Sequence, residues 1–342
     1  MTGIVGQGTT YNLPNYVGEL FNASPEDTPL LSAIGGLTGG RSTGGATMFE
    51  WQYYDLRAAA DDRQRLEGAA AGNGEQRVRA TGRNVVEIHQ EAVELSYTKQ
   101  AASGQRATGS EPQVTIGGTT LAASELAFQL DQQFKQIARD VDKTFITGQY
   151  QAPTDNNTPR KTRGLLQAIE TNVETFAGVT LGESVSVKAF GTKVLDLMQA
   201  IYDAGGISET ETRTIVVGSG MKRALTQAFV TEANYAERTR NVGGVNLQTI
   251  ETDFGLCNIM LDRHMPANTL IVASLEDLAP RFLEIPGKGH FFAEPLAKTG
   301  SADKVQIYGE IGLEYGNERK HGKLVLSEGG DESSSSSSSS AG

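Results

Sequence analysis

The chain has 342 residues, which at about 150 residues per domain is enough for two domains. Its apolar fraction of 38% is below the ~45–50% of ordinary globular chains, and its 40 glycines indicate many turns, loops or flexible arms. The formal net charge of −11 argues against a dedicated nucleic-acid-binding protein, because phosphate recognition relies on excess Lys and Arg, and the single cysteine excludes an intrachain disulfide.

The first 46 residues are rich in glycine and poor in apolar side chains. Short turn motifs occur at Leu13–Asn15 and Asp27–Pro29, and one brief apolar patch follows at Leu30–Ile34. Such a segment cannot build its own core. We therefore predict an arm that lies on some other surface.

Two strands are predicted next. Alternation over Met48–Tyr54 places three aromatic side chains on one face, which is typical of a half-buried strand. A second strand pattern runs over Val86–Tyr97, and its apolar phase changes near Gln90. The phase change predicts a bulge or a bend.

The intervening segment Asp55–Arg83 carries six arginines and five acidic residues among Ala and Gly. One interpretation is a solvated hairpin tip. The other is a long two-stranded projection whose Arg and carboxylate groups pair with a neighbouring copy, because an isolated hairpin is marginal in water. The candidate intersubunit residues are Arg57, Asp61, Asp62, Arg63, Arg65, Glu67, Arg77, Arg79 and Arg83.

A long amphipathic helix is predicted over residues 119–147, since its apolar residues recur at spacings of three and four. Thr119 or Thr120 is the candidate N-cap, and Gly148 is the expected stop. The apolar stripe is expected to pack in the core. It consists of Leu126, Leu130, Phe134, Ile137, Val141 and Phe145.

After about Arg160 the patterns become those of an α/β unit. A second amphipathic helix over Phe190–Ile201 ends at a pair of glycines, and a strand over Thr212–Val217 precedes a helix over Met221–Val230. Further strands are predicted at residues 245–250, 256–261, 270–273 and 304–315. Alternation in the last of these predicts a sheet with one buried face. The eight serines near the C-terminus are expected to be disordered.

The sequence predicts no catalytic, cofactor or metal site and no membrane span. The glycines of Val216–Lys222 lack the spacing of a phosphate-binding loop, so they are interpreted as a strand-to-helix turn. Asp262, Arg263 and His264 lack a G-x-S-x-G nucleophile and are interpreted as surface polar residues at a strand end. Cys257 lies between apolar residues and is interpreted as a small buried side chain.

The order of elements resembles the major capsid protein of tailed bacteriophages, which has the Hong Kong 97 fold. Particular segments resemble one branch of that family, long catalogued as a domain of unknown function. These segments are TYNLPNYVGELFNASPEDTPLLSAIGG, FEWQYYDL, NNTPRKTRGLLQAIETN, TDFGLCNIMLDRHMP and EPLAKTGSADK. The resemblance extends over residues 10–326.

The resemblance implies an α+β fold with an N-terminal arm, an extended β-hairpin loop, a peripheral domain with a spine helix, and an axial domain. The implied divisions are 1–46 for the arm, 47–100 for the extended loop, 101–159 for the peripheral domain with its spine helix at 119–147, 160–243 for the axial domain, 244–326 for a sheet returning to the peripheral domain with loops to the axial domain, and 327–342 for the tail.

The resemblance also implies a structural function without enzymatic activity. Copies of the chain would assemble in the host cytoplasm into hexamers and pentamers of an icosahedral shell, and this shell would enclose double-stranded DNA without binding it specifically. A separate scaffolding protein is expected because the arm reaches the first hairpin strand within 46 residues. A portal and a cement protein are further expected partners. The alternatives are an encapsulin-like compartment shell and a tail-tube protein.

Some shells of this fold are joined by an isopeptide bond from a lysine of the extended loop. In this chain the first lysine is Lys99, and Asp55–Arg83 contains only arginines as basic residues. A guanidinium with a pKa above about 12 is not a usable nucleophile. We therefore predict a shell that is held together without covalent bonds.

Overall fold

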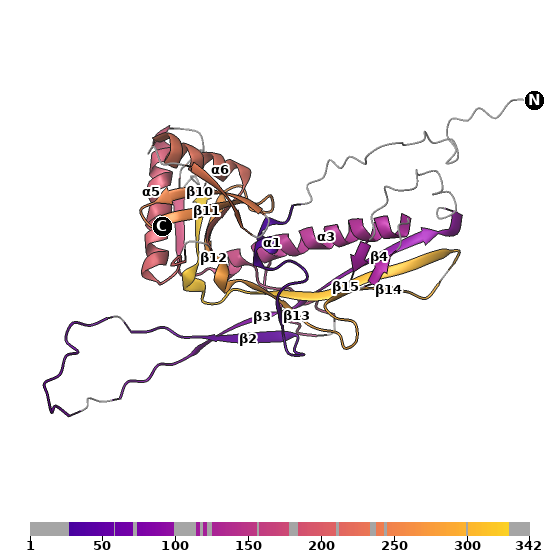
Figure 1. Cartoon of the computed structure of the whole chain (residues 1–342), viewed down its shortest axis with the longest axis horizontal. Coiled ribbons are helices and arrows are strands. Elements are labelled where there is room, and N and C mark those ends of the chain that lie inside the picture. Colours follow the sequence, from indigo (N-terminus) through magenta and orange to yellow (C-terminus); the bar gives the residue numbers. More distant parts are fainter. Residues whose placement is uncertain are drawn as a thin grey trace, which may run out of the picture.

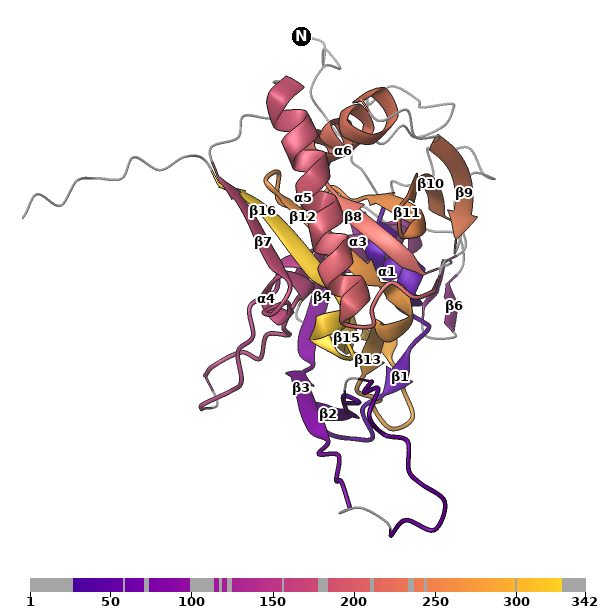
Figure 2. The ribbon, with the colours of Figure 1, turned by 90° about the vertical axis from the view of Figure 1, so that its left-hand side faces the viewer.

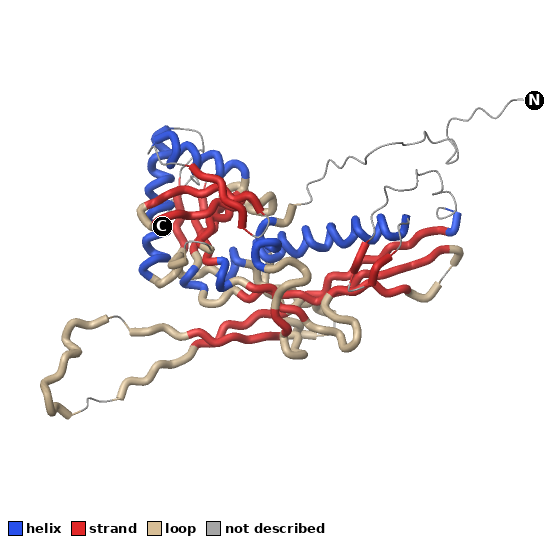
Figure 3. Tube along the Cα trace, in the orientation of Figure 1, coloured by secondary structure: helices blue, strands red, loops and turns tan. Residues whose placement is uncertain are grey.

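The computed structural model describes residues 27–57, 59–70, 74–98, 114–116, 119–121, 125–155, 157–177, 184–209, 212–232, 237–242, 245–298 and 300–327. The molecule is elongated. A long helix lies along a narrow sheet, a compact α/β block stands at one end of this helix, and a two-stranded hairpin projects from beneath both (Figure 1). Figure 3 shows that the far part of this projection is loop rather than strand.

The long helix is α3 (Glu125–Thr147). It ends where the N–H of Gly148 donates to the carbonyl of Thr144 (2.8 Å), as the sequence predicts. The predicted start at residue 119 is wrong, because Thr119 and Thr120 lie in a short strand, β6 (Thr119–Leu121), that pairs with β5 (Val114–Ile116). The β-branched threonines suit this strand better than a helix.

The sheet beneath α3 is organised around β15 (Ala302–Glu314). One edge of β15 pairs with β4 along its length, and the other edge pairs with two short strands in succession. A fifth strand joins in parallel at the margin. The other strands of this sheet are β1 (Arg41–Ser42), β4 (Glu87–Ser96), β13 (Ala279–Phe282) and β14 (Phe291–Pro295).

Strand β4 contains no bulge near Gln90, so that prediction is wrong. Its antiparallel register with β15 is unbroken from Glu87 to Ser96. The apolar phase changes because three of its inward positions are polar, namely Glu87, His89 and Glu91. Glu87 accepts hydrogen bonds from His89 (Nε2–Oε1 2.9 Å) and from the N–H of Thr162 (Oε2, 3.0 Å). The chain instead changes sheets between β3 (Ala80–Val85), which pairs with β2 (Met48–Tyr53), and β4, which pairs with β15.

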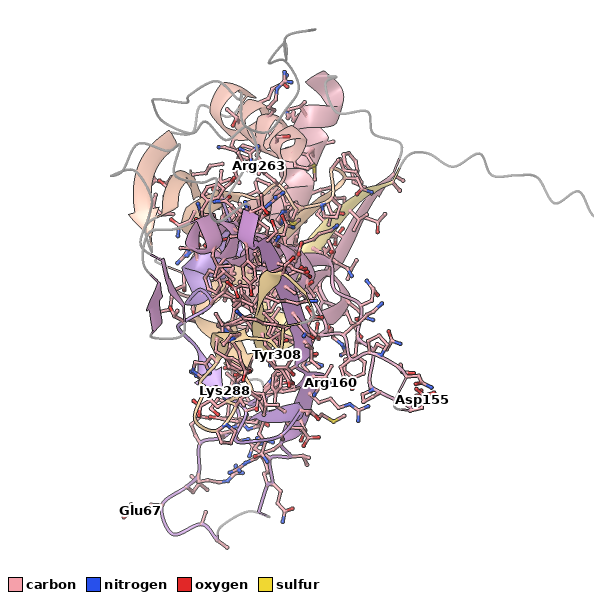
Figure 4. The ribbon with its side chains drawn as sticks, turned by 90° about the vertical axis from the view of Figure 1, so that its right-hand side faces the viewer. Glu67, Asp155, Arg160, Arg263, Lys288 and Tyr308 are labelled. Atoms are coloured by element: carbon pink, nitrogen blue, oxygen red, sulfur yellow. The ribbon has the colours of Figure 1, made fainter. Side chains whose placement is uncertain are left out.

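A second polar group lies on the other face of this ladder, where Glu310 of β15 is paired with the outward-facing Ile88. The guanidinium of Arg160 pairs with Glu310 (Nη2–Oε2 2.7 Å), which also accepts from the hydroxyl of Tyr308 (2.8 Å). Figure 4 labels Arg160 and Tyr308 in the middle of the molecule. The paired charges satisfy each other, so they are tolerated at low exposure.

The α/β block contains a seven-stranded mixed sheet in the order β7-β16-β12-β8-β11-β10-β9. Its central strands β8 and β12 are buried at every position, which is typical of strands covered on both faces. The strands are β7 (Val173–Ala177), β8 (Arg213–Val217), β9 (Glu237–Val242), β10 (Val245–Thr252), β11 (Gly255–Leu261), β12 (Thr269–Ser274) and β16 (Gly322–Ser327).

This topology corrects the predicted division of the chain after residue 244. Within 244–326, strands β10, β11, β12 and β16 belong to the seven-stranded sheet, and only β13, β14 and β15 join the sheet beneath α3. The chain enters the α/β block, leaves it for the long sheet, and returns for its last strand. Periodicity cannot reveal this division, because it identifies strands without identifying their neighbours.

One face of the seven-stranded sheet is covered by α5 (Ser184–Asp203), with α6 (Ser219–Thr226) beside it (Figure 2). Alternate residues of β8 supply two different cores. Ile215 and Val217 pack on the α5 side, whereas Val216 packs in the core that contains α3. The central strands of this sheet therefore join the two halves of the molecule.

The described part of the N-terminal segment packs against α3. Its short helix α1 (Pro29–Ile34) buries Leu30 and Leu31 in the core of α3. The described part of this segment therefore buries its apolar side chains in the core that contains α3, and does not form a core of its own. Residues 1–26, the serines of the tail and Lys99 lie outside the described residues.

Within the described residues, no helix is both long and apolar enough to cross a membrane.

Candidate assembly interface

The projection is a hairpin of β2 (Met48–Tyr53) and β3 (Ala80–Val85). The sequence predicted Val86–Tyr97 as the second strand of this hairpin. That pairing is wrong, because those residues contain the whole of β4, which belongs to another sheet. Strand β3 was not recognised because it contains Gly82, Arg83 and Asn84 and lacks an apolar alternation. The loop of the hairpin therefore runs from residue 54 to residue 79.

The base of the hairpin is anchored by Trp51. Its indole Nε1 donates to the carbonyl of Gly316 (2.7 Å), and its ring meets Tyr315 edge-on with centroids 4.8 Å apart. Opposite Trp51 in the ladder lies Gly82, where a Cβ would come within 2.5 Å of the indole ring. Glycine is required there because the ring occupies the space of a side chain.

Two polar side chains complete this anchor. Asn84 is fully buried, and its Nδ2 donates to the carbonyl of Leu313 (2.7 Å) while its Oδ1 accepts from the N–H of Arg163 (2.8 Å). Asp55, just beyond β2, accepts from Asn317 (3.1 Å) and pairs with Arg319 (3.0 Å). The hairpin thus leaves a fixed base in a defined direction.

The loop beyond this base has no core of its own. All of its described residues are exposed. Three large apolar side chains stand almost fully in solvent, with Leu56 at 77%, Leu66 at 86% and Val78 at 87% exposure. Sequence analysis did not single them out, although isolated large apolar residues in a segment of charges and glycines were a usable signal. None of the described residues of this chain covers these three side chains.

The charges of the loop are partly used within it. Glu75 on the returning limb contacts Arg77 (3.0 Å) and, across the loop, Arg57 (3.5 Å) and Arg63. The hydrogen bond from Arg63 is the largest of the effects that lower the pKa of Glu75. Glu75 is therefore a link between the two limbs, and it was not among the predicted contact residues.

The other predicted contact residues are spread along the projection. Arg79 donates to Gln52 (3.1 Å), and Arg83 lies opposite Glu50 in the ladder. The rest are exposed along the loop, and Figure 4 shows Glu67 at its far end. These are Asp61, Asp62, Arg65 and Glu67. Such charges remain available to a neighbouring molecule.

The predicted stripe of α3 faces the core. Leu130, Ile137, Val141 and Phe145 are buried, and Leu126 and Phe134 are half-buried against the same cluster. The ring of Phe134 meets Phe291 of β14 edge-on, with centroids 6.2 Å apart. The helix is therefore held against the long sheet by apolar packing.

A buried polar cluster lies where α1, α3 and the turn after β11 meet. Asp262 and His264 were interpreted as surface residues, which is wrong, since Asp262 is 1% exposed and His264 faces Asp142 of α3 (Nδ1–Oδ2 3.3 Å). Burial, followed by the charge of Asp262, raises the pKa of Asp142 to about 8. Sequence analysis missed the cluster because Asp142 is distant along the chain.

Comparison with known proteins agrees with this architecture. The model of the family described as SU10 major capsid protein matches residues 3–327. The major capsid protein of Escherichia phage Phieco32 is 28% identical over 142 residues, which are 42% of this chain and 34% of that protein. The match thus spans about a third of the length of that curated relative.

Solved capsids share the fold at low identity. The capsid of Myoviridae phage XM1 is 13% identical with a TM-score of 0.55, and the match covers 96% of this chain and 100% of that one. The capsid of cyanophage P-SCSP1u is 12% identical with a TM-score of 0.56, covering 95% and 97%. An encapsulin complex from Synechococcus elongatus is 9% identical with a TM-score of 0.54, covering 92% and 91%.

The fold is shared by phage capsids and an encapsulin, so the family assignment rests on the family model, which matches residues 3–327. The chain therefore belongs to the SU10 major capsid protein family, and it has the Hong Kong 97-like fold of phage capsid proteins.

Proposed function

We propose that this chain assembles with copies of itself into hexamers and pentamers of an icosahedral shell that encloses the double-stranded DNA of a tailed phage. The observation that carries this proposal is the projecting loop, which presents Leu56, Leu66 and Val78 to solvent from a rigid base. Covering one such side chain stabilises an interface by roughly 1.5–3 kcal/mol. The loop would lie on a neighbouring subunit and bury these side chains there.

The two halves of the molecule would take different places in the shell. The block with the seven-stranded sheet would correspond to the axial domain, near the local symmetry axis, and the unit of α3 and the β15 sheet would correspond to the peripheral domain. The boundary between them is best drawn by sheet membership, so that residues 245–274 and 322–327 belong to the axial domain.

The remaining partners follow from the same assembly. A separate scaffolding protein would guide shell formation in the host cytoplasm, a portal would occupy one vertex, and a cement protein would reinforce the contacts. The shell would retain DNA by enclosure, since a net charge of −11 on every subunit disfavours tight binding to phosphates. This function requires no catalytic residue.

The proposal is tested by replacing residues 56–78 with Asn-Gly. The hairpin base keeps Trp51, Asn84 and Asp55, so the variant subunit should fold and stay soluble. We expect it to form no closed shells in negative-stain electron microscopy under conditions in which the unaltered chain does. A matched variant with Leu56, Leu66 and Val78 all changed to Ser keeps the loop length and should also fail to assemble.

A control variant alters exposed polar side chains of the same loop without removing apolar ones. Gln64→Ser and Gln76→Ser should leave assembly intact. Normal shells from the variant that lacks residues 56–78 would refute the assembly role of the loop. Normal shells from the triple serine variant alone would show that its apolar side chains are not the contact.

A further inference from the structure

The buried cluster of Asp142, Asp262 and His264 joins three parts of the chain. Asp142 lies on the core face of α3, and the other two lie in the turn between β11 and β12. The N–H of Leu31 in α1 donates to Asp142 Oδ1 (2.8 Å). The cluster therefore stands at the junction of the N-terminal segment, the long helix and the seven-stranded block.

Each of the three side chains has a buried polar atom that makes no hydrogen bond, although His264 Nδ1 and Asp142 Oδ2 face each other at 3.3 Å. These atoms are Asp142 Oδ2, Asp262 Oδ2 and His264 Nδ1. Asp262 Oδ1 is already used, because it accepts from the N–H of His264 (2.8 Å). Asp142 and Asp262 are at most 1% exposed. Polar atoms buried in this way normally have a partner, since leaving one unpaired costs about 1–3 kcal/mol.

The three side chains converge. One oxygen of each carboxylate and one imidazole nitrogen all lie within 4.8 Å of one another. The adjacent Arg263 does not neutralise them, because its guanidinium pairs with Asp27 at the surface (Nε–Oδ1 3.0 Å). With both carboxyl groups deprotonated and the imidazole neutral, the cluster has a charge of −2, which a single divalent cation balances.

We propose that Asp142, Asp262 and His264 bind one divalent transition-metal ion of the Zn²⁺ type. Imidazole nitrogen and carboxylate oxygen are both ordinary ligands of Zn²⁺ at about 2.0–2.2 Å, and three protein ligands are sufficient for a four-coordinate ion. Ca²⁺ and Mg²⁺ fit less well, because they take six or more oxygen ligands or retain several waters.

The ion would have a structural role that is separate from the assembly loop. It would tie α3 to the turn after β11, and through Asp142 to the backbone of α1. Cross-linking elements from three parts of the sequence in this way stabilises the folded state by mass action, because the unfolded chain does not bring the ligands together.

The experiment uses the full chain, stripped with a chelator and dialysed into metal-free buffer. Zn²⁺ is then added, unbound metal is removed, and bound zinc is measured by inductively coupled plasma mass spectrometry. We expect about one Zn²⁺ per subunit and, at a hundredfold excess over Kd, a rise in melting temperature of about 5 °C. Co²⁺ in place of Zn²⁺ should give the visible absorption of a low-coordinate nitrogen and oxygen site.

Variants identify the ligands. His264→Gln and Asp262→Asn should each weaken Zn²⁺ binding at least about 100-fold. Loss of a group that only supports a metal ligand weakens binding by about 10–100-fold, and loss of the ligand itself should cost at least as much. The matched control is His290→Gln, which removes another half-buried histidine paired with a carboxylate (Glu284, 3.7 Å) and should leave Zn²⁺ binding unchanged.

The unaltered chain is sufficient to overturn the proposal even if the variants fail to fold. Sub-stoichiometric zinc, together with equal melting temperatures in Zn²⁺ and in chelator, would show that the two carboxylates share a proton instead. Full binding by His264→Gln would also overturn it. Neither result would bear on shell assembly, which is scored separately by electron microscopy.

Discussion

At the scale of single residues, His321 is held in the neutral form. It is fully buried, its Nδ1 accepts from the N–H of Ser274 (3.3 Å), and its Nε2 donates to the carbonyl of Tyr315 (3.0 Å). Burial lowers its pKa below the ordinary value. One ring nitrogen must therefore stay unprotonated for the fold to keep this hydrogen bond.

This arrangement makes the stability depend on pH. Below the unfolded pKa of about 6.5 the unfolded chain binds a proton that the folded chain does not, so the contribution of His321 is present above that pH and is lost on acidification. We expect the free energy of unfolding to fall by up to about 1.4 kcal/mol per pH unit in that window. Urea titrations of the unaltered chain and of His321→Gln at a series of pH values give the two free energies of unfolding, and their difference is the contribution of His321.

Comparing the pH dependence of stability in the two proteins removes the effects of the other titrating groups, because both proteins contain them. The variant should show a shallower loss of stability below about pH 6.5. Identical slopes for the two proteins would show that His321 does not titrate differently in the folded state.

Cys257 is a buried thiol with no catalytic role assigned. Burial raises its pKa to about 11, and its side chain is 0% exposed. Both effects suppress the reactive thiolate. We expect no labelling of the folded chain by iodoacetamide at about pH 8 and complete labelling in concentrated urea, read by mass spectrometry. Rapid labelling of the folded chain would mean that β11 opens readily.

At the scale of elements, α3 depends on its contact with the long sheet. Phe134 lies in the N-terminal half of α3, and its ring meets Phe291 of β14 edge-on, with centroids 6.2 Å apart. The α/β block stands at the other end of this helix (Figure 1). Phe134→Asp would remove this contact and place a charge against an apolar surface. We expect a loss of about 2–4 kcal/mol in the free energy of unfolding.

The matched variant Phe134→Leu keeps an apolar side chain and should lose less than about 1.5 kcal/mol. Chemical denaturation of both variants gives the comparison. Equal stability of the aspartate variant and the unaltered chain would show that this half of α3 is not held by the sheet.

At the scale of the whole molecule, two cores are joined by one sheet. Val216 of β8 and Ile271 of β12 face the core of α3, while their neighbours along each strand face α5. The two halves are thus coupled through strands buried on both faces, and they should unfold together rather than as independent domains.

The loops that leave this body are expected to hold the shell without covalent bonds. Residues 54–79 of this loop contain arginines and no lysine, so the projecting part lacks the amine that an isopeptide bond requires. Mature particles boiled in detergent and reductant should run at the mass of one chain. A ladder of pentamers and hexamers that survives boiling would contradict this prediction.

The sequence by itself determined the elements whose pattern is local. Alternation of apolar residues marked β2, and spacings of three and four marked α3 and α5, because a strand or helix with one buried face repeats that face at a fixed period. The exposed loop could also be predicted, since a segment of charged residues and glycines without a periodic apolar pattern cannot build a core.

Only the tertiary structure decided how these elements are joined. It paired β2 with β3, divided residues 245–327 between two sheets, and turned Glu87 of β4 inward. It also brought Asp142 to Asp262 across more than a hundred residues of chain. Pairing of strands and convergence of polar groups are set by long-range packing, and a periodic pattern along one segment contains no information about its distant partner.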